Sequence, residues 1–125
     1  MTESIKEANR YLSNAKELLS EKANRTNGVY QDAKYVKMAG HTAYCGVLFA
    51  LDLMIKQPKR NKRKSVEYYG EFLSKYDKKM LTEFNNLYDT LHLSLGYDGN
   101  TDVRISKVGL EMAKEFIAKV ATRLN

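Results

Sequence analysis

The sequence predicts an all-α protein, an up-and-down antiparallel bundle of four to five helices. The first indication is that its 125 residues contain one proline, Pro58, so that long stretches are free to be helical. The second is that apolar residues recur at steps of three and four, as they do on one face of a helix. The third is that no segment shows the sustained apolar–polar alternation typical of strands. Short connections between such segments favour antiparallel neighbours, and we expect residues 1–125 to form a single domain.

The first helix is expected over residues 4–22. Ser4 and Glu7 have the spacing of a capping box, which satisfies free amides at a helix start. Its inner face is predicted to consist of Ile5, Ala8, Leu12, Ala15 and Leu19. Residues 24–28 are polar and end in Asn-Gly, which indicates a turn.

The second helix is expected over residues 29–56, and it is predicted to be the central one. Residues 43–55 are apolar nearly all round, which is typical of a helix covered on several sides. This run has 13 residues and includes Asp52, whereas a membrane span needs about 20 apolar residues, so we expect no membrane segment. Small residues predict a close approach by neighbouring helices: Ala39, Gly40, Ala43, Gly46 and Ala50.

The third and fourth helices are expected over residues 66–76 and 78–95, with Ser65 and Asp77 as their N-caps. The predicted inner face of the third is Val66, Tyr69, Phe72 or Leu73, and Tyr76. That of the fourth is Met80 or Leu81, Phe84, Leu87 or Tyr88, Leu91 and Leu95.

The last helix is expected to start at Thr101 or Asp102, after a loop over residues 96–100, and to end near Arg123. Its predicted inner stripe is Ile105, Val108, Met112, Phe116 and Val120. The D-x-N-x-D pattern that starts at Asp98 fails as a calcium loop, because it lacks the required glycine and the final glutamate, and turn and capping chemistry accounts for it better.

The single cysteine, Cys45, excludes an internal disulfide and therefore a secreted disulfide scaffold. It lies in an apolar run, where a lone cysteine usually packs as a small hydrophobe. The first ten residues have no apolar signal core. A reducing cytoplasm is the expected location.

The positive charge is concentrated in residues 56–64, KQPKRNKRK. The chain has 21 Lys and Arg against 15 Asp and Glu, and without this segment the two kinds balance. Its bases are Lys56, Lys59, Arg60, Lys62, Arg63 and Lys64. They predict either a salt-sensitive contact with RNA or another polyanion, or a solvated connection between helices. No aromatic residue interleaves with them, so base stacking is not indicated.

His92 is the candidate for chemistry. Asn85, Tyr88, Asp89 and His92 fall on or near one helix face, where they suit either a general base with an orienting carboxylate or a polar patch between helices. His41, on the second helix, is expected to be a hydrogen-bonded structural histidine. Two histidines do not make a metal site, and no further ligands stand at helical spacing, so no metal or other cofactor is expected.

Two stretches resemble HEPN domains. Residues 41–53, HTAYCGVLFALDL, are similar to a HEPN helix with a small-and-aromatic pattern. Residues 88–120, with YDTLHLSLGYDG and then VGLEMAKEFIAKV, are similar to the C-terminal half of that domain. The sequence also resembles a small uncharacterised bacterial family with the same layout.

The HEPN resemblance implies an antiparallel helical bundle, often dimeric, and in many members a metal-independent RNase with an R-x(4–6)-H motif. The arginine position for His92 falls on Asn85, Asn86 or Leu87, and that for His41 falls on Lys34, Tyr35 or Val36. Asparagine cannot supply a fixed positive charge to a reacting phosphate. The resemblance therefore supports the fold and weakens the nuclease interpretation.

We therefore expect a non-catalytic binding or assembly module, homodimeric, that contacts RNA or another polyanion through residues 56–64. One alternative is a divergent metal-independent RNase that uses His92 with Asn85, Tyr88 and Asp89. A second alternative is a structural partner in a toxin–antitoxin-like pair.

Overall fold

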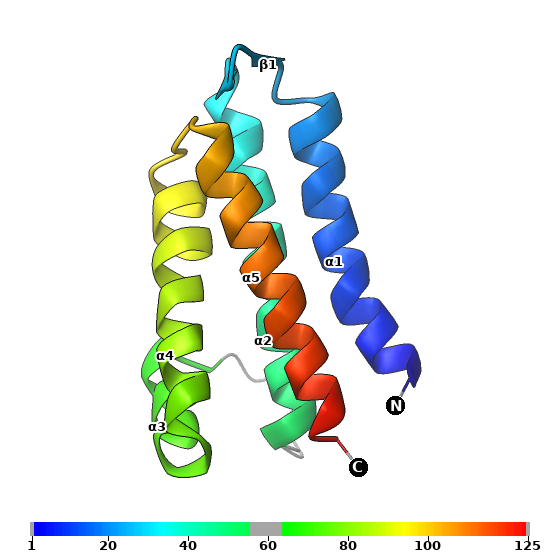
Figure 1. Cartoon of the computed structure of the whole chain (residues 1–125), viewed down its shortest axis with the longest axis vertical. Helices are drawn as coiled ribbons and strands as arrows, with labels where there is room; N and C mark the ends of the chain where they lie inside the picture. The colour runs from blue at the N-terminus through cyan, green and yellow to red at the C-terminus, as the bar shows by residue number, and fades with distance from the viewer. Residues whose placement is uncertain (1, 56–63, 125) are drawn as a thin grey trace.

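Four long helical rods form an antiparallel bundle, which confirms the predicted fold class (Figure 1). The computed structural model describes residues 2–55 and 64–124. Its helices are α1 (Thr2–Glu21), α2 (Ala33–Ile55), α3 (Val66–Tyr76), α4 (Lys78–Leu87), η1 (Tyr88–Tyr97) and α5 (Val103–Thr122). The rods are α1, α2, the continuous α4–η1 and α5, while the short α3 folds back against α4.

A two-stranded hairpin joins α1 to α2, in strands β1 (Arg25–Thr26) and β2 (Val29–Tyr30). The predicted Asn-Gly turn forms it, since Asn27 and Gly28 have φ of 53° and 78°, the left-handed values that a tight hairpin turn requires. The amide of Val103 donates to the carbonyl of Gly28 at 3.1 Å, which fastens the hairpin to the start of α5. Because these residues pair as strands, α2 begins at Ala33 rather than at residue 29 as predicted.

The central position predicted for the second helix is confirmed, because α2 packs against α1, η1 and α5. An ideal Cβ at Gly40 would lie 2.5 Å from the backbone nitrogen of Gly96 in η1. One at Gly46 would lie 2.9 Å from the carbonyl oxygen of Ala8 in α1. Glycine is therefore what lets both neighbours reach backbone contact with α2.

On length and composition α2 is able to cross a membrane, and it is the one helix in the described part of the chain with that property. Half of its apolar window is buried inside the bundle, and the core helix of a soluble protein passes the same test.

The predicted inner face of α1 is buried at Ala8, Leu12, Ala15 and Leu19, and Ile5 packs against the core. The predicted capping box is wrong, because α1 starts at Thr2 and places Ser4 inside the helix. Glu7 instead lies 3.5 Å from the guanidinium of Arg10.

The two middle caps are confirmed. The Ser65 hydroxyl accepts from the amide of Tyr68 at 3.1 Å, and Asp77 accepts from the amides of Lys79 and Met80 at 3.0 and 3.2 Å. Tyr76 was predicted to face inward, yet it is 44% exposed. It stacks on Phe72 at 5.6 Å, under the guanidinium of Arg123.

The predicted fourth helix changes from an α-helix to a π-helix at Tyr88. Residues 78–87 are α-helical, and the following ten residues form the wider π-helix η1, which ends at Tyr97. The amide of Asp98 still donates to the carbonyl of Leu93, five residues back, at 2.8 Å. π-Helical segments are rare and occur mostly at functional sites, so the face where η1 packs on α2 is a candidate functional site.

The predicted stripe of α5 is wrong at Val108, which is 56% exposed. The other predicted residues are confirmed, since Phe116 and Val120 are buried and Ile105 and Met112 pack partly buried against the core. The buried face of α5 also includes residues that were not predicted: Val103, Ser106, Gly109, Ala113 and Ile117. Cys45 is also exposed rather than packed as a hydrophobe.

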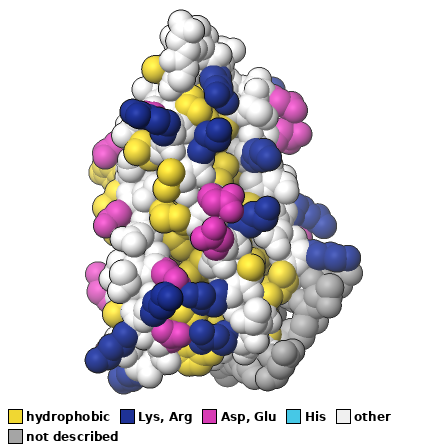
Figure 2. All heavy atoms as spheres, viewed as in Figure 1, with side chains coloured by type: hydrophobic (Ala, Val, Ile, Leu, Met, Phe, Trp, Pro, Cys, Tyr) yellow, Lys and Arg dark blue, Asp and Glu magenta, His cyan; other side chains and the backbone are white. Residues whose placement is uncertain are grey.

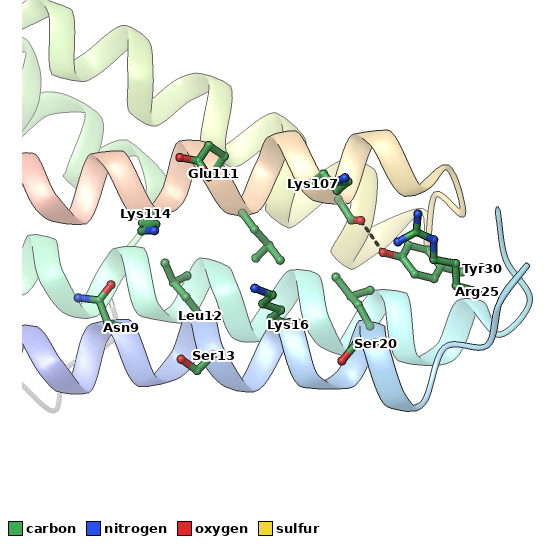
Figure 3. Close-up of a pocket in the computed structure, with 13 residues that line it drawn as sticks. Asn9, Leu12, Ser13, Lys16, Ser20, Arg25, Tyr30, Lys107, Glu111 and Lys114 are labelled. Atoms are coloured by element: carbon green, nitrogen blue, oxygen red, sulfur yellow. Dashed lines mark hydrogen bonds between the residues drawn. The ribbon is translucent and has the colours of Figure 1, made fainter. Parts of the chain in front are cut away.

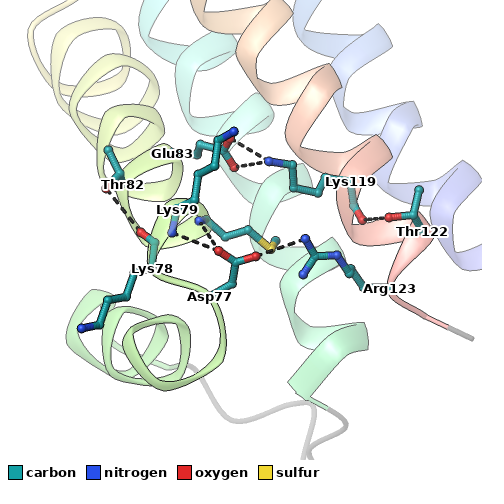
Figure 4. Close-up of polar contacts among 9 residues, drawn as sticks. Asp77, Lys78, Lys79, Thr82, Glu83, Lys119, Thr122 and Arg123 are labelled. Atoms are coloured by element: carbon teal, nitrogen blue, oxygen red, sulfur yellow. Dashed lines mark hydrogen bonds and ion pairs between the residues drawn. The ribbon is translucent and has the colours of Figure 1, made fainter.

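Ion pairs join the lower end of α5 to the junction of α3 and α4 (Figure 4). Arg123 lies 3.1 Å from Asp77, and Lys119 lies 2.8 Å from Glu83. The amide of Met80, the guanidinium of Arg123 and the amide of Lys79 hold the pKa of Asp77 below its usual range. These contacts close the end of the bundle opposite the hairpin.

Candidate functional site: a histidine–tyrosine cluster and a basic groove

Two pairs of aromatic side chains meet where α2 packs on η1. His41 and Tyr44 stand one turn apart on α2, and Tyr88 and His92 one turn apart on η1. The ring of His92 is the centre of the cluster, with ring centroids 5.4 Å from His41, 5.0 Å from Tyr44 and 5.1 Å from Tyr88. The sequence offered His92 as a candidate for chemistry and His41 as a buried or half-buried, hydrogen-bonded structural histidine. The expectation for His41 is wrong, because His41 is exposed and forms no hydrogen bond with the described residues, and the fold brings its ring against that of His92. We call these four residues the histidine–tyrosine cluster.

The glycines of the two helices set the spacing within this cluster. Gly40 meets the backbone at Leu91 and Gly96, and an ideal Cβ at Gly96 would lie 3.0 Å from Cε1 and Nδ1 of His41. A side chain at either position would push η1 away from α2. The histidine contact therefore depends on two glycines that carry no chemistry themselves.

His92 is partly buried, and its surroundings favour the neutral imidazole. Its Nδ1 is buried and has no hydrogen-bond partner among the described residues. Desolvation, and then the nearby His41, lower the pKa of His92 from its usual 6.5. His92 is therefore neutral at pH 7, which suits a proton acceptor. Burial, with Tyr88 and Cys45 nearby, raises the pKa of Tyr44, so its hydroxyl stays protonated.

Asn85 and Asp89, which were also predicted to act with His92, form no hydrogen bond with it in the described part of the chain. Asn85 and Asp89 are exposed, and within the described part of the chain their side chains form no hydrogen bond or ion pair. Asp89 does not orient the imidazole, since Nδ1 of His92 is unpartnered. Lys34, the point-charge substitute for an arginine, lies 4.8 Å over the ring of Tyr35. The fixed cation that a phosphate reaction requires is thus missing from these positions.

The cluster also offers few metal ligands. No group of three His, Cys, Asp or Glu side chains that could hold a metal ion gathers anywhere in residues 2–55 and 64–124. His41 and His92 supply two nitrogens, whereas protein sites for zinc use three or four ligands.

The basic segment lies almost entirely outside the described residues, since Lys56, Lys59, Arg60, Lys62 and Arg63 fall in residues 56–63. Lys64 is described, and its side chain is 8% exposed. Its ammonium lies 3.2 Å from Oδ1 of Asp52, which also accepts a hydrogen bond from Tyr69 at 2.9 Å. Lys64 is therefore engaged with α2, and the predicted polyanion contact is left to the other five bases.

Sequence reasoning missed a groove of about 580 Å³ between α1 and α5 (Figure 3). Tyr30 lies at its hairpin end, where the Tyr30 hydroxyl is 2.7 Å from Oγ of Ser106. Ser106 itself donates to the carbonyl of Val103, so Tyr30 is the donor in this buried pair. Periodicity alone did not reveal the groove, because its walls come from the first and the last helix of the chain.

The chain belongs to the family of a domain of unknown function, DUF5618. The family model matches residues 3–122. Among solved structures, the chain is similar to a protein of unknown function from Dyadobacter fermentans, at 46% identity, over 99% of this chain and 98% of the other, with a TM-score of 0.90. No curated protein matches the chain. The resemblance to an uncharacterised family is thus confirmed.

Proposed function

We propose that this DUF5618 domain is a non-catalytic, HEPN-like helical module that binds RNA or another polyanion through residues 56–64. The observation that carries the proposal is the placement of charge. The net charge of +6 equals the number of bases in that segment, while the remainder of the chain is balanced. Clustered Lys and Arg bind phosphate backbones through counterion release, with little need for a shaped site.

Ion pairing elsewhere supports this assignment. Arg123 and Lys119 are paired with Asp77 and Glu83, and Lys64 is paired with Asp52. These cations stabilise the bundle and are less available to a ligand. The five bases that precede Lys64 are the densest remaining source of positive charge in the sequence.

Binding of a single-stranded RNA measures this directly. If four of the bases contact phosphates, the slope of log affinity against log salt is about −3. Replacing Lys59, Arg60, Lys62 and Arg63 with Glu is expected to abolish binding, whereas Lys64→Met is expected to leave it nearly unchanged. Unaltered binding by the four-residue variant would contradict the proposal.

Dimerisation and a cytoplasmic location belong to the same proposal. Met38 and Tyr97 are 45% and 71% exposed, so apolar surface is available for a second copy. An exposed free Cys45 suits a reducing compartment. Light scattering of the purified chain decides the oligomeric state, and a monomer at cellular concentrations would remove dimerisation from the proposal.

A divergent metal-independent RNase is the second candidate, and the contact between His41 and His92 favours it. A neutral imidazole beside a second imidazole is the arrangement of a general base and general acid. Lys37, one turn before His41, runs along the loop at Gly99 and is the nearest cation by position on α2. His92→Ala is expected to remove cleavage of mixed RNA if this candidate holds, with binding retained. Absence of cleavage by the wild-type chain excludes it.

A further inference from the structure

The groove between α1 and α5 has the composition of a binding surface. Its walls present four cations, Lys16, Arg25, Lys107 and Lys114, against one carboxylate, Glu111. None of these five groups forms an ion pair with another residue of the described part of the chain. This differs from the lower end of the bundle, where Lys119 and Arg123 are paired. The groove therefore has an uncompensated positive charge.

The floor of the groove is aliphatic. Leu12 and Leu19 of α1 and Leu110 of α5 line it, and the methylene stems of its lysines add apolar surface to the walls. Tyr30 is the aromatic residue of the lining, and it is 5% exposed with its hydroxyl bound to Ser106. Bases of a nucleic acid therefore find no ring to stack on, so the floor disfavours RNA as the occupant.

The shape of the groove suits a helix. It follows α1 from Asn9 to Ser20, which at 1.5 Å per residue is about 16 Å, or three helical turns. Lys114 and Asn9 lie towards one end, Lys16 in the middle, and Arg25 and Lys107 towards the other (Figure 3). The cations are thus distributed along its whole length. On the face of Figure 2, Lys and Arg side chains lie towards the hairpin end and again towards the opposite end, with apolar and acidic side chains between them.

We propose that this groove binds an acidic amphipathic helix of a partner protein. The leucines of such a helix pack on Leu12, Leu19 and Leu110, and its flanking carboxylates face the lysines of both walls. Recognition of this kind reads residues at i, i+3, i+4 and i+7 of the bound helix. None of the residues that line the groove belongs to residues 56–64, so the proposal goes beyond polyanion binding and is tested independently of it.

The test uses a labelled peptide of about 14 residues, long enough for three to four turns, with a leucine stripe flanked by glutamates. A peptide with the same stripe flanked by lysines, and a single-stranded RNA, are the comparison probes. Binding to the full chain is followed by fluorescence anisotropy between about 50 and 200 mM salt. The acidic peptide is expected to bind with salt-sensitive affinity, and the basic peptide is expected not to bind.

The groove variant is the double substitution Lys16→Glu and Lys114→Glu. Its control is Lys75→Glu with Lys78→Glu, which changes the net charge equally at exposed positions of α3 and α4, away from the groove. The groove variant is expected to weaken binding of the acidic peptide at least ~10-fold, and the control variant is expected to weaken it less than ~2-fold. Leu110→Gln tests the floor of the groove without a change in charge and is expected to lower the affinity for the same peptide.

Failure of the acidic peptide to bind, or equal weakening by the groove and control variants, overturns the proposal. Loss of RNA binding in the groove variant, with no peptide binding, overturns it as well and assigns the groove to nucleic acid. Circular dichroism of each variant confirms that the helices are retained.

Discussion

Replacing Gly40 with alanine tests whether backbone contact between α2 and η1 sets the geometry of the histidine–tyrosine cluster. The added Cβ would lie 2.5 Å from the nitrogen of Gly96, 2.6 Å from the carbonyl oxygen of Leu91 and 2.7 Å from Cβ of Leu95. Ordinary contacts between heavy atoms are about 3.5 Å or longer, so η1 must move away by about 1 Å. None of the three atoms belongs to the far end of a flexible side chain, so no rotamer change relieves the clash.

The expected cost follows from two opposing effects. Overpacking by one methyl group costs about 3 kcal/mol when backbone must move, the upper part of the usual range. Alanine in a helix interior gains about 1 kcal/mol over glycine, which leaves a net destabilisation of about 2 kcal/mol. For a chain of this length that corresponds to a fall in Tm of roughly 6–10 °C.

Urea unfolding followed by circular dichroism measures the change, and Gly70→Ala is the matched control. Gly70 is also inside a helix, but the nearest atom to its added Cβ is Cδ1 of Leu81 at 3.9 Å. This control is expected to stabilise the protein by up to ~1 kcal/mol, because only the propensity gain applies. A Gly40→Ala protein as stable as the wild type would refute the reasoning, as would equal losses at both glycines.

Three further predictions follow from described contacts. His92 is expected to titrate below pH 6.5 by NMR, and His41→Gln is expected to raise the pKa of His92. Because the pKa of His92 is lower in the folded than in the unfolded state, its contribution to the free energy of unfolding should be complete above about pH 6.5 and should fall as the pH drops towards the folded-state pKa. His92→Gln should remove that pH dependence. Asp52→Asn is expected to cost about 1–3 kcal/mol in urea unfolding, because it leaves the ammonium of Lys64 nearly buried without a carboxylate, and adding Lys64→Met should recover part of the loss. Tyr30→Phe removes the hydroxyl that donates to a buried serine and is expected to cost about 1 kcal/mol, and no change in unfolding midpoint would contradict a stabilising role for this hydrogen bond.

The helices that the sequence predicted best are those whose ends depend on local chemistry. The observed α3, Val66–Tyr76, matches its predicted bounds, because Ser65 and Asp77 cap adjacent helix starts through their own side chains. The inner face of α1 was also predicted, since it is made of large apolar residues and alanines at regular spacing.

Val108, the misassigned residue of the predicted α5 stripe, shows where periodicity fails. The buried side of α5 includes Ser106 and Gly109, which a search for apolar residues does not count. Gly109 is buried because Thr90 and Leu91 approach closely, to 3.0 and 3.1 Å of an ideal Cβ, and Ser106 because Tyr30 donates to it. Both reasons are tertiary contacts, so the pattern placed Val108 inside instead.

The candidate site was predictable in its residues and not in its assembly. The sequence singled out His92 and Tyr88 from their helical spacing, and it noted His41 on another helix. What joins them is the width of η1 and the approach of two glycine backbones, neither of which follows from local propensity. The groove was missed for a similar reason, because a groove is a property of two helices at once.

The basic segment and the histidine–tyrosine cluster are separate in the sequence. His41 stands 14 residues before the end of α2 at Ile55, which is about 21 Å along the helix axis, and the basic segment begins only after that end. The histidine–tyrosine cluster has no arginine, and the cations with no ion pair at the groove lie between α1 and α5 rather than beside η1. The proposed binding module requires the basic segment alone, whereas the RNase requires the imidazoles as well. Loss of His92 should leave RNA affinity intact, and loss of the basic residues should leave the histidine titration intact, so that coupling of the two in either direction would favour the RNase over the binding module.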